Sequence, residues 1–510
     1  MIALITFYLW EKTVFIDSEE QLYWYLFVHF GVIVVSIISL KWTFLPKKLK
    51  ALMWGLITVS LFYIVFISWN IVFRWYSDTF AFKGNIFRGI FYGFRAPFYG
   101  RPNLKIVLAD YYPLIISSVL FIILVFTIKW NKYSKWTETI LLFAGALLFF
   151  SFAWDTSIHK TLVASNCHYK TFSEGLAFFT DWPSFLPSYI DQMKNLGAHN
   201  NHYPPGVLML LKFNNESFPY LFKIIVLSAP LVSIYPLKGI LKHFSIPKER
   251  INIYIAFYIS TFALLFFPGT SITPLHLPFA TSFLYFLIRS IYNWKISYGI
   301  FAGLILAIYA FFSFSFIVFA LFCFVYLALL LLYKKIELQQ LLLPALIIIT
   351  TFVVIYIAIN LLFDFNLYSC FNVAFSNESA QMKSSGLDNL TRYFIVSSGN
   401  LIAYIGILGP IIIGLFAERF YSAALKQNTS FNLIIKSALL TIIILSFSGQ
   451  FHLEVERIWI FLTPIVLFGV LLYKPDQLTI GVKKYTVLRI ALTLNILISI
   501  VYSIMINKCI

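Results

Sequence analysis

The residues best suited to chemistry gather in one polar segment, residues 181–206, which reads DWPSFLPSYIDQMKNLGAHNNHYPPG. This segment places the carboxylates Asp181 and Asp191 and the imidazoles His199 and His202 in a chain that is otherwise almost continuously apolar. Ionisable groups are costly inside a bilayer unless they serve a water-filled site. The segment therefore predicts where the chemistry of the protein takes place.

The polar segment ends in the string HYPPG, residues 202–206, and an apolar run follows directly. Two adjacent prolines remove two backbone donors and fix φ, so the chain is expected to reach the membrane in an extended, rigid form. A new apolar segment can begin only after Gly206, which holds His202 at the boundary between water and lipid. There the imidazole either donates to a phosphate or bonds a backbone carbonyl, and both roles stay open.

The remainder of the chain has the composition of a polytopic membrane protein. Of its 510 residues 60% are hydrophobic, 19% are aromatic and 12% are charged, and the mean hydropathy is +0.84. Apolar stretches long enough to cross roughly 30 Å of hydrocarbon recur from end to end, and they predict an all-α protein of about 14 spans with a long outer loop bearing amphipathic helices. The expected spans are 24–40, 51–73, 111–128, 138–154, 219–240, 251–267, 276–292, 297–312, 314–333, 341–362, 395–416, 431–447, 458–473 and 485–507.

The basic residues are distributed as the positive-inside rule expects for cytoplasmic connections. The net charge is +17, and Lys and Arg stand in short clusters beside apolar runs, as at 41–50, 242–250 and 334–335. This placement indicates orientation in the membrane and not nucleic-acid binding. We therefore predict a multi-pass protein of the cell membrane with an extracytoplasmic active site and no cleaved targeting segment. The predicted outer connections are 74–108, 155–206, 268–275, 363–394 and 448–457.

Residues 74–105 depart from the charge pattern, because they carry six cations against the single carboxylate Asp78. Phe, Tyr and Trp are interleaved with Arg in this stretch, which suits a helix lying in the membrane interface. Such a helix is either a lipid-anchoring collar or a surface that gathers an anionic lipid substrate.

Three stretches of the chain resemble the GT-C superfamily of polytopic glycosyltransferases, including its protein mannosyltransferase-like and lipid A sugar transferase-like branches. The connection 155–206 opens with an acidic residue after a span and closes with HYPPG, which is similar to the first long outer loop of that superfamily. Residues 303–316 resemble its glycine- and serine-spaced helix pair. Residues 454–464, EVERIWIFLTP, resemble its outer arginine followed by an aromatic residue and a proline. In two departures, Thr156 follows Asp155 in place of a second acid, and a tyrosine interrupts His-Pro-Pro.

The resemblance implies a transmembrane transferase module at residues 138–475. It is preceded by an N-terminal membrane region, 1–137, with the basic aromatic loop, and followed by a C-terminal transmembrane helix, 476–510. The implied enzyme moves a hexosyl or pentosyl group from a polyprenyl-phosphate-linked donor to a glycan, lipid or protein acceptor. Its partners would be the donor, the acceptor and membrane lipids, with no nucleic acid. A polymerase or ligase of lipid-linked glycans and a lipid or glycan transporter are the alternatives.

An enzyme of this kind needs a carboxylate to take the acceptor proton as an oxocarbenium-like transition state forms. The candidates in the first long connection are Asp155, Glu174, Asp181 and Asp191. Asp181 is the first choice, because the tryptophan and proline that follow it make its surroundings partly apolar. The same string also fits a helix N-terminus with proline early in the first turn, in which Asp181 would be a cap.

The leaving phosphate of such a reaction needs a cation. Arg457 is the first candidate, because a guanidinium at the outer end of a span holds a phosphate through two parallel bonds while Glu454 and Glu456 orient it. The alternative is an ordinary ion pair at the membrane boundary. Arg392 is either a second phosphate contact or an interface anchor. A divalent cation, Mg²⁺ or Mn²⁺, suits the chemistry, although no ligand spacing demands one. The predicted substrate-binding residues are His202, Tyr203, Arg457, Glu456 and Arg392.

Overall fold

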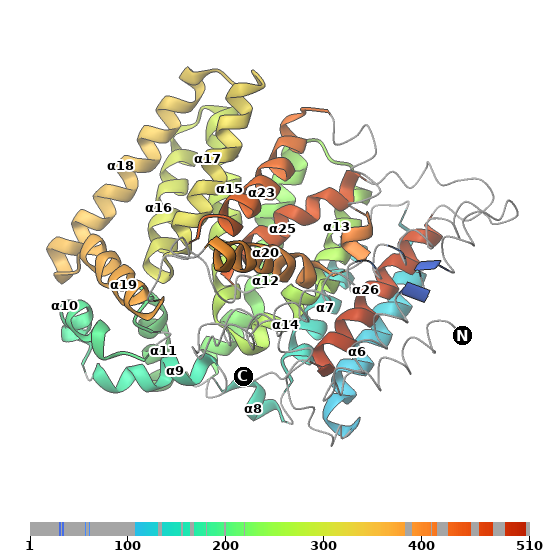
Figure 1. The fold of residues 1–510 in the computed structure, drawn as a ribbon, viewed down its shortest axis with the longest axis horizontal. Coiled ribbons are helices and arrows are strands. Elements are labelled where there is room, and N and C mark those ends of the chain that lie inside the picture. Colours follow the sequence, from blue (N-terminus) through green and yellow to red (C-terminus); the bar gives the residue numbers. More distant parts are fainter. Residues whose placement is uncertain are drawn as a thin grey trace, which may run out of the picture.

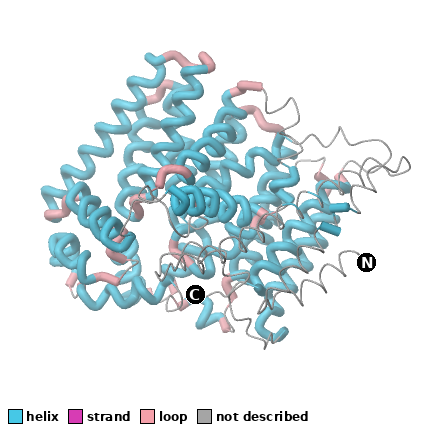
Figure 2. The backbone as a smooth tube through the Cα atoms, in the orientation of Figure 1, coloured by secondary structure: helices cyan, strands magenta, loops and turns pink. Residues whose placement is uncertain are grey.

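All the elements that the structure, a computed structural model, describes are α- or 3-10 helices, and no strand occurs among the described residues (Figures 1 and 2). The expectation of an all-α chain is confirmed for this part of the protein. The described residues are 30–31, 33–34, 57, 61, 108–130, 135–154, 157–163, 168–179, 181–197, 200–218, 220–382, 390–409, 411–415, 427–449, 458–472 and 485–505. The elements are α6 (Leu108–Thr127), α7 (Lys135–Phe152), α8 (Ile158–Leu162), α9 (His168–Gly175), η1 (Leu176–Phe178), α10 (Trp182–Gln192), η2 (Met193–Asn195), α11 (Gly206–Ser217), α12 (Leu221–His243), α13 (Lys248–Ser260), α14 (Phe262–Thr270), η3 (Thr273–Leu275), α15 (His276–Asn293), α16 (Ile296–Phe312), α17 (Ser315–Leu332), α18 (Leu338–Phe363), α19 (Leu367–Met382), α20 (Leu390–Leu408), α23 (Ser430–Ser446), η4 (Ile460–Leu462), α25 (Thr463–Val466), η5 (Leu467–Leu472) and α26 (Thr486–Met505).

Several of these helices have the length and apolarity that a membrane span requires. Within the described residues α7, α12, α17 and α18 meet both conditions, and α13 with α14 makes a fifth candidate if their 45° bend lies inside one span. The apolar parts of α6, α16, α23 and α26 are shorter. The helices are therefore compatible with a multi-pass membrane protein, while the count of about 14 spans stays a prediction. The expected spans 24–40 and 51–73 lie almost entirely outside the described residues.

The bend between α13 and α14 has a clear hydrogen-bonding cause. Thr261 leaves the helical conformation, with φ −76° and ψ 127°, so a carbonyl of α13 loses its partner within the helix. Two side chains of α26 replace the lost hydrogen-bond donor: the Asn495 amide and the Ser499 hydroxyl donate to the Ser260 carbonyl oxygen at 2.9 and 3.0 Å. A broken apolar helix is tolerated where neighbouring helices satisfy the freed backbone groups in this way.

Helices α15, α16 and α18 form one packed layer, in which α16 contacts both of the others (Figure 1). Two glycines of α16 allow close approach to α18. A Cβ at Gly299 would stand 2.8 Å from the Ile347 side chain, and one at Gly303 would stand 2.6 Å from Thr351 Cβ. Small residues four positions apart let two helices pack closely. The helix pair predicted at 303–316 is present as the end of α16 and the start of α17.

Short turns join the successive helices from α12 to α18, and neighbours run in opposite directions if α13 and α14 are taken together as one bent helix. The turns at 244–247, 294–295 and 333–337 share one end, which carries the basic clusters. The connections at 271–275, 313–314 and 364–366 share the other end. Helices α9, α10, α11 and α19 gather at this second end, beneath α16 and α18 in Figure 1. Together with residues of α12, α16 and α18 they form a second apolar core, which includes Phe172, Phe185 and Tyr189.

The structure differs from the continuous span that the sequence predicts at 458–473. Residues 460–472 form η4, α25 and η5 in succession, and so they do not make one continuous α-helix. Pro464 lies at the start of α25 and cannot donate a backbone hydrogen bond, which favours a break there. The segment is nonetheless almost completely buried against the main apolar core.

Candidate functional site

Helix α11 begins directly after the two prolines, at Gly206, one residue earlier than the sequence predicts. The carbonyl oxygen of Tyr203 accepts a hydrogen bond from the Tyr189 hydroxyl of α10 at 2.8 Å. The Asn377 amide of α19 donates to the carbonyl oxygen of Asn201 at 3.2 Å. The turn that carries His202 is thus held by two helices that lie close in space and far apart in sequence.

The ring of Tyr203 lies beside a buried polar group, to which the turn before α11 and the helices α15, α16 and α17 contribute. Its centroid lies 5.3 Å from that of Phe172 in α9 and 6.4 Å from that of His276, the first residue of α15. His276 is 1% exposed, and its Nδ1 lies 3.4 Å from the Ser315 hydroxyl at the start of α17. Further hydroxyls complete the group. We define the His276 cluster as Tyr203, His276, Tyr309, Ser313 and Ser315.

Hydrogen bonds within the His276 cluster centre on Ser315. The Ser313 hydroxyl donates to the Ser315 oxygen at 2.9 Å, and the Tyr309 hydroxyl lies 3.0 Å from the same atom. The His276 ring also faces the Tyr309 ring, with centroids 5.9 Å apart. These contacts give the buried His276 imidazole a defined place within a network of hydroxyl groups.

The segment 268–276, which leads into the His276 cluster, collects the ends of several other helices. The Tyr169 hydroxyl of α9 lies 2.9 and 2.8 Å from the carbonyl oxygens of Pro268 and Ser271. Burial raises the pKa of Tyr169 well above its usual value, so the hydroxyl stays protonated and donates. Lys223 of α12 donates to the Gly269 carbonyl oxygen at 2.7 Å, and its ammonium lies 3.7 Å from the centre of the Tyr169 ring. A buried cation is thereby satisfied by a carbonyl and an aromatic face.

Asp181 lies at the solvent-exposed start of α10, the helix N-terminus that the sequence left as the alternative. Its carboxylate accepts from the Ser184 hydroxyl at 2.9 Å. The next residue, Trp182, donates its indole N–H to Glu216 at 2.7 Å, near the last turn of α11. Because Tyr203 precedes the first turn of α11, the two groups lie at opposite ends of that helix, separated by about 15 Å along its axis. The structure therefore does not bring Asp181 and Tyr203 together.

Glu216 forms a compact ion pair beside Trp182. Lys212, one turn earlier in α11, donates to Glu216 at 2.7 Å and to the Phe179 carbonyl oxygen at 3.3 Å. The hydrogen bond from Lys212, followed by that from Trp182, lowers the pKa of Glu216 below its usual value. These bonds fix the loop helix α10 against the end of α11.

Several predicted site residues lie elsewhere or outside the described residues. Asp155, Glu454, Glu456 and Arg457 are outside them. Ala153, two positions before Asp155 in the chain, packs against Gly269: a Cβ at that glycine would stand 2.9 Å from the Ala153 Cα. The remaining predicted residues are Glu174 and Asp191, which are exposed on α9 and α10, His202, which is half-buried, and Arg392, which lies in α20.

The residues that follow Arg457 pack beside the start of α15. Element η4 contacts both η3 and α15. Trp459 is fully buried with its ring centroid 5.9 Å from that of Tyr404, and Phe461 lies 5.5 Å from Phe319 of α17, again between ring centroids. The two motifs of the sequence, HYPPG and IW, are thus both brought to the beginning of α15.

The sequence did not single out His276 or Lys223. The polar run Ser271, Thr273 and His276, placed between two apolar helices, was the available signal for the imidazole. Among the described residues no group of three His, Cys, Asp or Glu side chains has metal-binding geometry. The divalent cation stays a prediction. No family model, curated protein or solved structure matches this chain.

Proposed function

We propose that the protein is a multi-pass glycosyltransferase of the cell membrane, which moves a sugar from a polyprenyl-phosphate-linked donor to an acceptor hydroxyl on the extracytoplasmic side. The contact between Tyr203 and His276 is the observation that supports this best. It joins the proline-rich end of the polar segment to a buried imidazole at one end of an apolar bundle. Groups able to bind a phosphate or exchange a proton meet there.

The proposed side of the membrane follows from charge. The His276 cluster lies at the end of α15, α16 and α17 opposite to Arg289, Lys295, Lys334 and Lys335. By the positive-inside rule, the basic end is cytoplasmic. The cluster and the helices α9 to α11 would then face outward, as an enzyme using a lipid-linked donor on the outer surface requires.

His276 acts in this proposal as a positioning residue. Its ring fills the space between Tyr203 and Tyr309, and its Nδ1 is fixed by Ser315. Together with the hydrogen bond from Tyr189 to the Tyr203 carbonyl, this holds the turn before α11. His202, in the same turn, is thereby kept at a constant position from which an imidazole can donate to the donor phosphate. Arg457 and a divalent cation would supply the remaining positive charge.

Asp155, Glu174 and Asp181 are the first three of the four candidate carboxylates for the general base, and the contacts of the described residues around them favour two of these three. Glu174 belongs to α9, whose Phe172 contacts Tyr203. Asp155 follows closely after Ala153, which packs against Gly269 in the segment leading to His276. Asp181 lies near the C-terminal end of α11, away from Tyr203. We therefore propose that Asp155 or Glu174 takes the acceptor proton and that Asp181 serves mainly as the start of α10.

The test uses purified protein in lipid nanodiscs, supplied with radiolabelled polyprenyl-phosphate hexose and pentose donors and a membrane extract as the acceptor. Replacing the base by its amide should lower transfer by roughly 10²–10⁴-fold and leave donor binding intact. We expect this from Asp155→Asn or Glu174→Gln, and near-normal transfer from Asp181→Asn. Glu249→Gln, at the basic end in the first turn of α13, is the control.

The outcomes separate the alternatives. A dead Asp181→Asn enzyme with both other variants active would assign the base to Asp181, as the sequence first suggested. Normal transfer in all three variants and in Asp191→Asn would remove the carboxylate mechanism. Absence of any transfer by the wild-type protein, despite donor binding, would favour a transporter or a ligase of lipid-linked glycans.

A further inference from the structure

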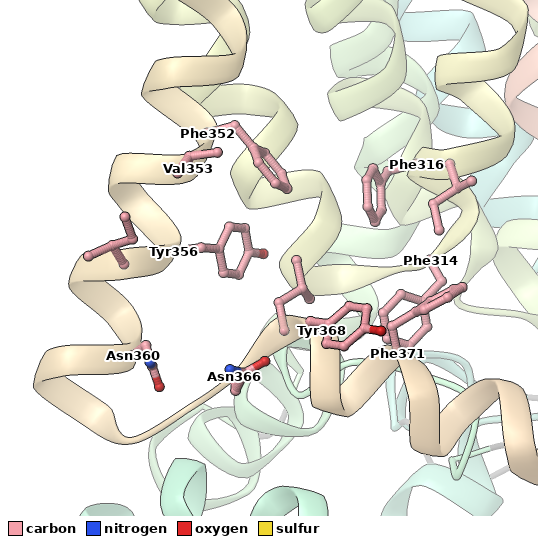
Figure 3. Close-up of a pocket in the computed structure, with 12 residues that line it drawn as sticks. Phe314, Phe316, Phe352, Val353, Tyr356, Asn360, Asn366, Tyr368 and Phe371 are labelled. Atoms are coloured by element: carbon pink, nitrogen blue, oxygen red, sulfur yellow. The ribbon is translucent and has the colours of Figure 1, made fainter.

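A groove runs between the start of α17, the second half of α18 and the start of α19 (Figure 3). Its volume is about 440 Å³. Aromatic contacts form its walls, with ring centroids 6.0 Å apart for Phe316 and Phe352 and 5.4 Å apart for Phe314 and Phe371. The Tyr356 hydroxyl donates to the Ala307 carbonyl oxygen of α16 at 2.9 Å, which closes the floor. The groove is therefore shaped by packed side chains.

The groove lies along α18, a helix whose apolar surface is mostly left uncovered by the rest of the protein. Helix α18 is a candidate membrane span of which only 11% of the apolar window is buried in the protein. Ile317 and Val353 on the groove walls are 42% and 44% exposed. Such a surface needs hydrocarbon to cover it, and in a membrane the available hydrocarbon is that of lipid chains.

The length of the groove fits a single lipid leaflet. On α18 its lining extends from Phe352 to Asn360, a rise of about 12 Å. One leaflet of the hydrocarbon core is about 15 Å thick. The polar end of the groove, with Asn360, Asn366 and Tyr368, coincides with the end of α18 and the start of α19. An acyl chain lying in the groove would thus place its head group beside these three residues.

The chemistry of that polar end disfavours an anionic head group. All the described residues that line the groove are uncharged. Asp364, the residue that caps the C-terminus of α18 between Asn360 and Asn366, is exposed and adds negative charge nearby. Amides, a phenol and a carboxylate are suited to hydrogen-bond the hydroxyls and ester carbonyls of an uncharged lipid.

The groove and the candidate site share the segment that joins α16 to α17. Phe314 and Phe316 line it, and they alternate in the chain with Ser313 and Ser315 of the His276 cluster. A lipid held in the groove would therefore have its head group on the same side of the bundle as His276. Two adjacent binding regions are what a reaction between a lipid-linked donor and a lipid acceptor requires.

We propose that this groove binds one acyl chain of an uncharged diacyl lipid with a hydroxylated head group, and that this lipid is the sugar acceptor. The acceptor role rests on the proposed glycosyltransferase function, while the binding site does not. The reaction would form a bond from the anomeric carbon to the oxygen of the lipid hydroxyl and break the bond to the donor phosphate. The hydroxyl proton would pass to the carboxylate base, and polyprenyl phosphate would leave.

The experiment uses the full chain in nanodiscs with a diacylglycerol probe that carries a photoreactive diazirine on one acyl chain, and maps the cross-linked peptides by mass spectrometry. Val353→Trp fills the groove. Val354→Trp, the matched control, makes the same change at the next residue of α18, which is 57% exposed and does not line the groove. We expect labelling of α17, α18 and α19 to fall severalfold in Val353→Trp and to be unchanged in Val354→Trp.

Competition and product analysis complete the test. Unlabelled diacylglycerol should displace the probe, and the same amount of anionic phosphatidylglycerol should not. Equal labelling of both variants, or equal displacement by phosphatidylglycerol, would overturn the proposed site. If Val353→Trp loses the probe and yet transfers sugar to diacylglycerol normally, the acceptor assignment is wrong. Groove-dependent labelling without sugar transfer by the wild-type protein to any acceptor leaves the lipid site standing and removes the glycosyltransferase proposal.

Discussion

Gly206 lies so close to Phe311 that a Cβ at position 206 would stand 2.5 Å from the Phe311 carbonyl oxygen. This contact sets how closely α11 packs against the last turn of α16. It occurs at the last residue of the HYPPG string, where the chain leaves the turn that carries His202. The glycine of this motif therefore has a packing role in addition to following the two prolines.

Gly206→Ala is expected to destabilise the protein, because backbone atoms must move to admit the methyl group. Overpacking of this kind costs about 1–3 kcal/mol. Thermal unfolding of the purified protein in one detergent measures the loss. Gly197→Ala is the matched control, since no atom lies within 4 Å of a Cβ there. Equal unfolding temperatures for the two variants would mean that the contact between α11 and α16 is not rigid.

The long helices could be predicted from the sequence because their apolar runs have the length of a span and end at polar or basic clusters. Helices α12 and α15 to α18 lie within a few residues of expectation. The break at Thr261 could not be predicted in the same way. No proline or glycine marks it, and the groups that satisfy it, Asn495 and Ser499, come from the far end of the chain.

The candidate site was predictable only in part, for a related reason. Local rules place the start of a new apolar segment after Gly206, and α11 begins within one residue of that position. The neighbours of Tyr203 are set by tertiary packing, since Phe172 and His276 belong to α9 and α15. Asp181 is close to Tyr203 in sequence but not in space. One end of α11 places Glu216 beside Trp182, and Tyr203 lies at the other end of that helix.

The pair of Lys212 and Glu216 predicts a dependence of stability on pH. Hydrogen bonds from Lys212 and Trp182 lower the pKa of Glu216 in the folded protein from the ordinary value of 4.5. The carboxylate therefore contributes stability that is present above pH 4.5 and is lost as the pH falls through its lowered pKa. The difference in unfolding temperature between wild type and Glu216→Gln should be largest near neutral pH and shrink below pH 4.5. In a Lys212→Met background the pH dependence of that difference should become much smaller.

The proposed topology rests on the separation of the basic turns from the His276 cluster, and it can be tested by labelling. In a variant without the four native cysteines, Gly197→Cys should react with an impermeant thiol reagent in intact cells, because the residue is exposed at the end of the bundle that carries α9 to α11. Lys248→Cys, exposed at the opposite end, should react only after the membrane is permeabilised. The reverse pattern would move the candidate site to the cytoplasmic side and contradict the proposed use of an outer lipid-linked donor.

Arg457 offers the most direct test of phosphate binding in the proposed reaction. Lysine keeps the charge but loses the planar fork that holds a phosphate through two parallel bonds, so Arg457→Lys should lower sugar transfer by roughly tenfold to a hundredfold, equivalent to about 1.4–2.7 kcal/mol. Affinity for the polyprenyl-phosphate donor should weaken in parallel.

Arg489→Lys provides the control, because the Arg489 guanidinium donates to the Ile128 carbonyl oxygen at 3.2 Å and has no place in the proposed site. Both variants are compared at equal protein level, with transfer and donor binding measured on the same nanodisc preparation. Full activity of Arg457→Lys would reduce Arg457 to an ion pair at the membrane boundary. The phosphate would then have to be held by His202 and a divalent cation, and His202→Gln in the Arg457→Lys background should in that case abolish donor binding.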